Sequence, residues 1–422
     1  MSSLQKSDIL LSKYILLIIS FYLIFGNFGR IGVSFNITEV VIFFIAPSFF
    51  LFKRIPTKMF FSALLLSTFL ITSLIIGIFK SDVIIDYIQY NIRLIFQIIT
   101  GFCFGISLWL YELKNNSFEK LITYYINIYI ILCIISLFIL LIFPDSVVLW
   151  DLLLAIGYNL TSPDPHYMRV VSTYFDPNFF GNIILFPFIL SFVNIINKFS
   201  RNNLIKFGIL FLSVLLTFSR STIAATIFCL LIMILVYLFI SIKNRRVYKS
   251  TFIIFTVFLA SIIGILSSDF VINRLADRIS NTSVNDGSTL ARLESFSVGQ
   301  ELFLREPLLG YGYNFSIDLQ KQLRGTIALD SSLQVILISF GIIGTMILFV
   351  LLIVYIINLI MKYKNAYQYE KLITFSFILY LIISILFLSN FNQLIFYPFW
   401  IIPVIGIGTF LSIRHIRKNS FI

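Results

Sequence analysis

The sequence predicts an all-α polytopic membrane protein with a large external loop that contains amphipathic helices. Three observations predict this fold class: an apolar composition, long apolar runs, and basic residues between those runs. The chain is 59% hydrophobic and 12% charged, whereas a soluble domain carries about 25% charged residues. Such a chain cannot present a solvated surface on every side, so we expect it to lie in a bilayer.

Apolar runs long enough to cross a membrane recur along the whole chain. A spanning helix needs about 20 apolar residues, and runs of that kind predict about twelve transmembrane helices in a single domain, 1–422. The run 37–52 contains Glu39 and the run 204–218 is short, so these two are the weakest. The predicted helices are 9–26, 37–52, 59–79, 93–111, 121–143, 178–196, 204–218, 222–242, 251–267, 333–360, 371–389 and 395–412.

The basic residues predict the orientation of these helices. If both termini are cytoplasmic, every inner loop is basic, as the positive-inside rule requires. The segments 144–177 and 268–332 are then the two large external segments. Lysine predominates inside, and arginine predominates outside. Arginine binds phosphate and carboxylate bidentately, so the external arginines favour an anionic ligand. The alternative is that the external arginines form ion pairs with the external Asp and Glu residues.

Several partner and cofactor classes find no support in the sequence. The net charge of +12 does not indicate nucleic-acid binding, because the basic residues form short clusters at helix ends, where they meet anionic lipid headgroups. The cysteines Cys103, Cys133 and Cys229 lie inside apolar runs and are expected to be packing residues. The two histidines are too far apart for a metal site, and no Asp-x-Asp pair is present. We therefore expect no cofactor and no metal.

The first external segment carries several candidate binding residues. Asp176 and Pro177 predict a helix start, with Asp as the N-cap and Pro at the first helical position. Asn178 and Asn182 are four residues apart and share one face of the helix that follows. In a membrane, such groups need either another helix or a ligand as a partner. Arg169 lies just upstream, within reach of the mouth of this helix.

Two further arginines lie at predicted helix ends. Arg220 is central in a short turn, 217–222, between two spans and is flanked by hydroxyl residues. It either extends to the outer headgroups or faces the interior of the bundle, and we favour the interior. Arg93 lies at the outer mouth of the fourth predicted span, where we expect it to line the same cavity.

The long external loop is predicted to contain two helices. Residues 268–280 have an amphipathic pattern, and a second helix from about Thr289 to Arg305 carries Arg292 and ends before a proline. A glycine-punctuated turn, 308–314, follows. We expect the loop to form a lid that brings Arg292 toward Arg169 and Arg220.

Three carboxylates in this loop are candidate catalytic bases. They are Asp330, Glu294 and Asp318. Asp330 directly precedes the predicted helix 333–360, so it is either the N-cap of that helix or a functional group.

Four stretches resemble, in this order, the O-antigen ligase/polymerase family of bacterial membrane glycosyltransferases. Together they cover about residues 165 to 345. The stretches are Arg169…Phe175-Asp-Pro-Asn178…Gly181, Thr217-Phe-Ser-Arg220, Arg292…Pro307-Leu-Leu-Gly310-Tyr-Gly312, and Asp330-Ser-Ser-Leu-Gln334…Phe340-Gly-Ile-Ile-Gly344.

The resemblance implies an enzyme that transfers glycans from a polyprenyl pyrophosphate donor at the outer leaflet of the inner membrane. It implies that Arg169, Arg220 and Arg292 contact the donor pyrophosphate. Where ligases of the family have a histidine proposed as the base, this chain has Asp330. This departure favours a repeat-unit polymerase over a ligase. The expected partners are an undecaprenyl-pyrophosphate-linked glycan, membrane lipid and a chain-length regulator.

The residues themselves fit this chemistry. Arginines stabilise the negative charge that grows on a departing pyrophosphate, and a carboxylate accepts the proton of the acceptor hydroxyl. We therefore expect metal-independent, inverting transfer. The remaining alternatives are an O-antigen ligase acting on lipid A core, a lipid-linked oligosaccharide flippase, and an assembly subunit. A transporter tends to contain two related halves, and no internal repeat is evident.

Overall fold

The protein is almost entirely helical in the computed structural model. Most of the predicted helix 37–52, all of 251–267 and 268–280, and Asp318 lie outside the residues that the structure describes. The described residues are 6–31, 35–36, 40–42, 44–45, 57–80, 85–115, 117–155, 166–243, 287–317, 319–320, 329–364 and 366–418.

The helices follow the apolar runs closely, because each run satisfies its own backbone hydrogen bonds when it is helical. The two-residue strands β1 and β2 pair antiparallel, with Arg30 opposite Asn36. The elements are α1 (Lys6–Phe25), η1 (Gly26–Gly29), β1 (Arg30–Ile31), β2 (Phe35–Asn36), α3 (Thr57–Lys80), α4 (Ile85–Asn115), α5 (Phe118–Ile142), α6 (Ser146–Ala155), η2 (Ser172–Tyr174), α7 (Pro177–Asn197), α8 (Arg201–Leu216), α9 (Arg220–Lys243), α12 (Gly287–Arg305), α14 (Ser332–Tyr363), α15 (Gln368–Leu386), η3 (Leu388–Asn390) and α16 (Pro398–Lys418).

The predicted count of about twelve spans is not confirmed. Within the described part of the chain, six helices are long and apolar enough to cross a membrane. Other apolar helices, such as α1 and α16, contribute apolar stretches of 10–17 residues, for example Leu10–Phe25 and Pro398–Arg414. The six are Ile88–Asn115, Phe118–Ile142, Pro177–Asn197, Arg220–Ile240, Ser332–Tyr363 and Gln368–Asn390.

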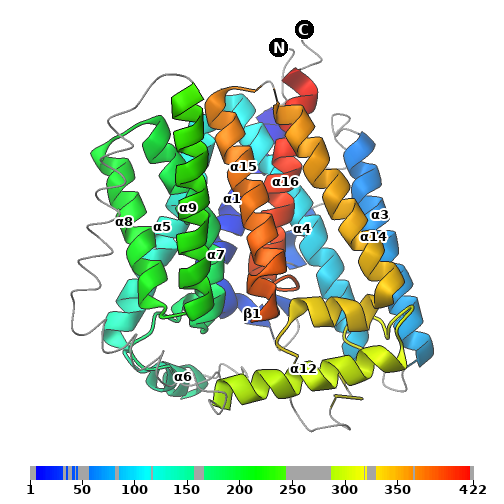
Figure 1. The fold of residues 1–422 in the computed structure, drawn as a ribbon. Helices are drawn as coiled ribbons and strands as arrows, with labels where there is room; N and C mark the ends of the chain where they lie inside the picture. The colour runs from blue at the N-terminus through cyan, green and yellow to red at the C-terminus, as the bar shows by residue number, and fades with distance from the viewer. Residues whose placement is uncertain are drawn as a thin grey trace.

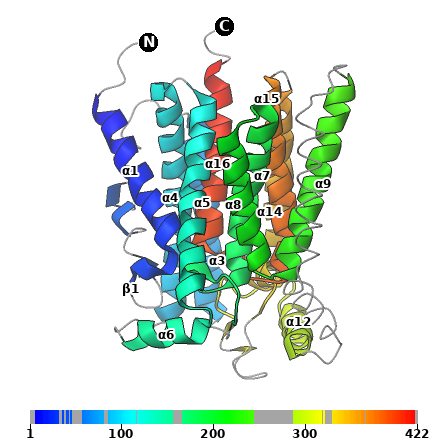
Figure 2. The same ribbon diagram turned by 90° about the vertical axis from the view of Figure 1, so that its left-hand side faces the viewer.

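The long helices stand side by side and form a bundle with two different ends. α1 begins and α16 ends at the upper end in Figure 1. α6 and α12 lie across the lower end, roughly at right angles to the bundle (Figures 1 and 2). We call the end that carries α6 and α12 the loop end, and the opposite end the terminal end.

Close approach of α4 and α16 forms the centre of the bundle. These two helices make the most extensive helix–helix contact within the described residues. A Cβ atom at Gly105 would lie 2.4 Å from the carbonyl oxygen of Gly406, and one at Gly101 would lie 2.8 Å from Cβ of Ile405. Small residues therefore let the two backbones approach closely, as is common between helices in membranes.

A buried ionic cluster joins three helices at the terminal end. Arg414 of α16 donates to Glu112 of α4 over 2.6 Å and to Glu370 of α15 over 2.8 Å. Its guanidinium lies 4.2 Å from the ring centre of Phe118. The charges of buried side chains require such partners, so this arginine is a structural tie as well as part of the basic terminal end.

Helix α14 is broken at Gly341, which has φ 62° and ψ −172°. Figure 1 shows that its first part lies across the loop end before the helix turns along the bundle. The Gly-punctuated loop 307–312 inserts into this break. Ile342 N–H donates to the Pro307 carbonyl over 2.8 Å, and Tyr311 N–H donates to the Ile338 carbonyl over 2.9 Å. The loop thus forms hydrogen bonds with backbone groups of α14 that would bond to one another in a continuous helix.

The same loop is also tied to α3. Lys80, the last residue of α3, forms a 2.5 Å ion pair with Glu306 and donates to the Gly310 carbonyl over 3.1 Å. A Cβ atom at Gly312 would lie 2.6 Å from the carbonyl oxygen of Ser73. The third and fourth family-like stretches therefore form one packed unit against α3.

The break predicts a strong requirement for glycine at position 341. A Cβ atom there would lie 2.2 Å from the Leu308 carbonyl oxygen, and the positive φ disfavours any other residue. Gly341→Ala should lower the free energy of unfolding by about 1–3 kcal/mol. The check is the apparent melting temperature of purified protein in detergent.

The matched control is Gly208→Ala in α8, where an added Cβ atom meets nothing within 4 Å. We expect its melting temperature to stay the same or rise slightly, because alanine favours the helix. Equal melting temperatures for both variants would contradict the claim that the break in α14 requires glycine at position 341.

Candidate functional site

Strained backbone marks two neighbouring segments at the loop end. Met168, Ser172 and Phe175 have φ values of 54°, 60° and 61° in the segment before α7, and Phe218 has φ 48° in the turn before α9. Non-glycine residues rarely adopt such values, and they persist where the surrounding structure holds them. Here Met168 N–H donates to the Pro144 carbonyl over 2.7 Å. Strain of this kind clusters at functional sites.

Arg169 joins these two segments. It is buried, and its Nε–H donates to the Thr217 carbonyl over 2.8 Å. Its Nη1 lies 3.3 Å from Nδ1 of His166, which accepts because arginine can only donate. Val170 N–H donates to the Leu216 carbonyl over 2.9 Å. Arg169 therefore fixes the turn that carries Arg220, which gives it a structural role in addition to the predicted contact with ligand.

Asp176 caps α7, as the Asp-Pro pair predicts. Its Oδ1 accepts from the N–H groups of Asn178 over 2.6 Å and Phe179 over 2.9 Å. Asp176 and the side chain of Asn178 are partly exposed at the start of this helix. Capping accounts for the position of Asp176, and a contact with ligand stays a prediction for both residues.

Asn182 contacts other helices in the bundle. It is fully buried, and Oδ1 accepts from the Thr222 hydroxyl of α9 over 3.0 Å. A Cβ atom at Gly181 would lie 2.7 Å from the Thr222 side chain, so α7 and α9 approach closely here. The Tyr380 hydroxyl donates to the Asn182 carbonyl over 3.4 Å. Of the two partners predicted for Asn182, another helix or a ligand, the structure shows the helix.

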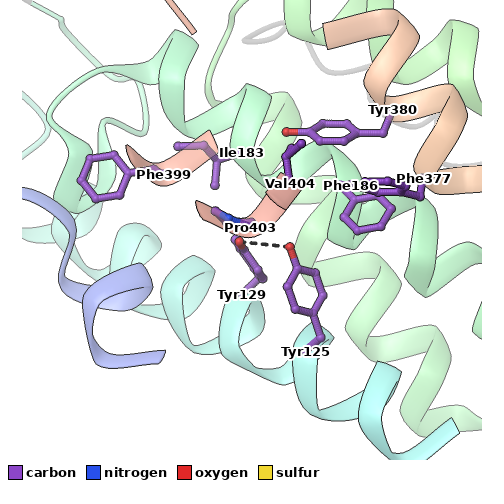
Figure 3. A pocket seen from close by; sticks show the side chains of 9 residues that line it. All are labelled: Tyr125, Tyr129, Ile183, Phe186, Phe377, Tyr380, Phe399, Pro403 and Val404. Atoms are coloured by element: carbon purple, nitrogen blue, oxygen red, sulfur yellow. Dashed lines mark hydrogen bonds between the residues drawn. The ribbon is translucent and has the colours of Figure 1, made fainter. Parts of the chain in front are cut away.

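A small cavity borders Ile183, the next residue of α7 (Figure 3). It is lined by aromatic residues that include Tyr125, Tyr129 and Tyr380, and its volume is about 10 Å³. The Tyr125 hydroxyl donates to the Tyr129 hydroxyl over 3.2 Å. This volume holds at most about one water molecule, so the cavity is no substrate site.

Arg220 is the first residue of α9 and is partly buried. The N-terminus of a helix carries partial positive charge, which favours an anion and disfavours a cation. The Ser219 and Ser221 hydroxyls lie 3.4 Å apart beside it. An anion at this place would interact with the helix N-terminus and with the guanidinium together. The contact of Arg220 with an anion stays a prediction.

Arg292 and Asp330 lie where α12 meets α14. The guanidinium of Arg292 lies 5.7 Å from the ring centre of Phe391. The backbone N–H of Asp330 donates to the Ser295 hydroxyl over 3.1 Å. The cap of α14 is Ser331, so the N-cap explanation for Asp330 is wrong. The side chain of Asp330 is partly exposed, and its role as a base stays a prediction.

The other two candidate bases are less well supported. Glu294 is exposed on α12. Its role as a base stays a prediction. Asp318 lies outside the described residues, so its role stays a prediction.

Arg93 lies beside the loop that follows α12. Burial raises the pKa of the Tyr313 hydroxyl, and the positive charge of Arg93 opposes this rise. The Tyr313 backbone is held on both sides: its N–H donates to the Ser73 hydroxyl over 3.2 Å, and its carbonyl accepts from the Asn91 amide over 3.0 Å. The Tyr313 ring stacks on Phe396 at 4.6 Å. We call these contacts of Tyr313 with α3, α4 and Phe396 the Tyr313 clamp. The sequence did not predict them, because only the glycines around Tyr313 formed a recognisable pattern.

Sequence reasoning also missed the segment 388–397, which contacts both groups of candidate residues. Beyond the Arg292–Phe391 contact, the hydroxyl of Ser332 at the start of α14 donates to the Asn392 carbonyl over 2.9 Å. At its other end the ring of Tyr397 lies 4.1 Å from that of Phe179 in α7. The available signal was the polar run 390–393 between two apolar spans.

The candidate residues therefore fall into two groups, on helices that contact one segment at the loop end. One group, on and before α7 and α9, contains Arg169, Asp176, Asn178 and Arg220. The other, on α12 and α14, contains Arg292 and Asp330. The expectation that α12 brings Arg292 close to Arg169 and Arg220 stays a prediction.

The role of Arg169 in holding the 217–220 turn can be tested by stability. Arg169→Met should lower the free energy of unfolding by about 1–3 kcal/mol, because it leaves the buried Thr217 carbonyl without this donor. Arg305→Met, which removes an exposed ion pair with Glu301, should change it by less than about 1 kcal/mol. Apparent melting temperatures in detergent measure both. Equal shifts would show that Arg169 does not hold the turn.

Comparison with known proteins agrees with the resemblance found in the sequence. Residues 205–349 match a family model described as O-antigen ligase, and this range contains Arg220, Arg292 and Asp330. No curated protein matches the chain. This match, together with the four stretches, makes the chain similar over residues 205–349 to the O-antigen ligase/polymerase family of membrane enzymes that transfer glycosyl groups from lipid-linked sugars.

Proposed function

We propose that this protein is a polysaccharide repeat-unit polymerase. It joins oligosaccharides linked to undecaprenyl pyrophosphate, on the outer face of the inner membrane. The observation that carries this proposal is Asp330. It stands at the position of the ligase histidine, it lies beside the helix that carries Arg292, and it is not needed to cap α14.

The reaction needs three chemical tasks, and the described residues suit each of them. The acceptor hydroxyl attacks the anomeric carbon, the bond from that carbon to the pyrophosphate oxygen breaks, and the hydroxyl proton passes to the Asp330 carboxylate. Arg220 and Arg292 stabilise the charge that grows on the departing pyrophosphate. A single displacement inverts the anomeric configuration, and the products are a longer lipid-linked glycan and undecaprenyl pyrophosphate.

The arrangement of the two ends of the bundle supports a site on the outer face of the membrane. α6 and α12 lie together at the loop end, away from the start of α1 and the end of α16 (Figure 1). The basic residues of the inner segments favour cytoplasmic termini. The loop end then faces the periplasm, where a lipid-linked glycan, membrane lipid and a chain-length regulator are the proposed partners.

An O-antigen ligase is the second candidate. The description of the matching family model favours it. A ligase transfers a completed glycan once to lipid A core, whereas a polymerase acts repeatedly on lipid-linked repeats. The product distribution therefore separates the two functions without knowledge of the sugar.

The direct test incubates purified protein with lipid-linked repeat units and resolves the products on a gel. We expect a ladder. Arg220→Ala, Arg292→Ala and Asp330→Asn should each lower its rate of formation by about 10²-fold or more. Arg305→Ala, at an exposed ion pair on the same helix as Arg292, should keep the ladder.

Three outcomes would overturn the polymerase proposal. A single product that needs lipid A core indicates a ligase, and movement of the repeat between leaflets without covalent change indicates a flippase. A ladder that survives all three substitutions would exclude these residues as the site.

The proposal also predicts a metal-independent reaction, because arginines rather than a cation stabilise the leaving pyrophosphate. Addition of a strong chelator to the purified system should leave the rate of ladder formation unchanged. A loss of activity that added divalent cation restores would contradict this prediction.

A further inference from the structure

His166 is a buried histidine to which the proposed reaction gives no role. The chain contains one other histidine, His415, which lies in α16. The start of α6 holds the backbone of His166. Its N–H donates to the Ser146 hydroxyl over 2.7 Å, and its carbonyl accepts from the Ser146 N–H over 3.0 Å. These two contacts fix the point from which the imidazole extends.

The protonation state of His166 follows from its contact with Arg169. Nη1 of Arg169 lies 3.3 Å from Nδ1 of His166. Every guanidinium nitrogen carries hydrogen and can only donate, so Nδ1 accepts and carries no proton. The imidazole is therefore neutral, with its proton on Nε2. A second proton would bind to Nδ1, where it would remove the acceptor and place another positive charge against the guanidinium.

Arg169 connects this histidine to the turn before α9. Its Nε–H donates to the Thr217 carbonyl over 2.8 Å. The hydrogens of a guanidinium lie in one rigid plane, so an acceptor for Nη1 also sets the direction of Nε–H. The next residue of the turn, Phe218, has φ 48°, a strained value that persists only where the surroundings hold it. A chain of contacts therefore runs from His166 to the turn that carries Arg220.

The imidazole has charged groups on both sides of the balance around it. A carboxylate favours a charged imidazole, and a guanidinium opposes it. The ring itself contacts the guanidinium of Arg169. Asp145 uses Oδ1 to accept an N–H in the first turn of α6 over 2.9 Å. The charged and titratable groups on the segments that contact His166 are Arg169, Tyr167, Asp145, Asp151 and Arg220.

We propose that neutral His166 is a positioning residue of the candidate site, which orients Arg169 and thereby holds the turn that carries Arg220. Protonation of His166 at acid pH breaks its contact with Arg169 and releases the turn. The event is the reversible binding of one proton, within the range of about pH 5 to 8 in which histidines titrate. The effect on polymer formation rests on the proposed function, whereas the effect on the contact itself does not.

The first test is the pH profile of ladder formation by the full-length protein. Its rate should fall at least about tenfold between about pH 7.5 and about pH 5.5. In His166→Asn the amide oxygen stands near the position of Nδ1 and cannot take up a proton. This variant should stay within about threefold of the unaltered protein at about pH 7.5 and should lose most of the acid-dependent fall. His166→Leu, which has no acceptor, should be at least about tenfold slower at about pH 7.5.

The matched control is His415→Asn, which removes the other histidine of the chain. It should keep both the rate and the acid-dependent fall of the unaltered protein. If His166→Leu fails to fold as judged by its melting temperature, His166→Gln takes its place. Its longer side chain carries the amide oxygen away from the position of Nδ1, so it should not restore the rate as His166→Asn does.

The second test measures melting temperatures in detergent and does not depend on turnover. Residues that act through one contact have non-additive effects. The double variant His166→Leu, Arg169→Met should therefore melt at about the temperature of Arg169→Met alone. The melting temperature of the unaltered protein should also fall more on acidification than that of His166→Asn. A folded state that keeps His166 neutral binds fewer protons than the unfolded state, so its stability decreases as the pH falls.

The positioning role is wrong if His166→Asn keeps the acid-dependent fall of the unaltered protein in both rate and melting temperature. It is also wrong if His166→Asn is as slow at neutral pH as His166→Leu, or if the melting-temperature shifts of His166→Leu and Arg169→Met simply add. If the melting temperatures behave as expected but the unaltered protein forms no ladder, the positioning role stands and the polymerase proposal fails.

Discussion

The insertion of loop 307–312 into the break of α14 is the interaction on which the loop end depends. A helix interrupted in a membrane exposes backbone groups that lipid cannot satisfy, and such a break is tolerated only where protein covers it. Here the loop supplies both donors and acceptors to positions 338–343. The same contact fixes the end of α12, the start of α14 and the direction in which α14 leaves the site.

The consequences of this contact extend in two directions. Toward the loop end, it holds Asp330 beside α12 through the Ser295 hydroxyl, and it holds the Tyr313 clamp between α3 and α4. Toward the bundle, Phe340, the residue before Gly341, lines an apolar pocket together with residues of α3 and α4. The unit around the break therefore borders both a carboxylate and an apolar pocket.

The three arginines of the family-like stretches have different surroundings. Arg169 is buried and uses its guanidinium to hold the turn before α9, whereas Arg220 and Arg292 are only partly buried. Buried charges in a membrane protein need fixed partners. The three arginines look equivalent in the sequence, but their burial differs, and a contact of Arg220 and Arg292 with a pyrophosphate stays a proposal.

Within the described part of the chain, the sequence by itself predicted most of the apolar helices and the cap of α7, because apolar runs form their own backbone hydrogen bonds and the Asp-Pro pair acts on its nearest neighbours. It also placed the family-like stretches in order. Only the tertiary structure decided that Ser331 rather than Asp330 caps α14, that Asn182 contacts Thr222, and that segment 388–397 contacts both α7 and α14. For the cap, two neighbouring residues are both suitable N-caps, and the local pattern does not choose between them. For the other two the physical reason is range: these pairings join residues far apart in the chain, and no local pattern encodes which of several suitable partners a side chain meets.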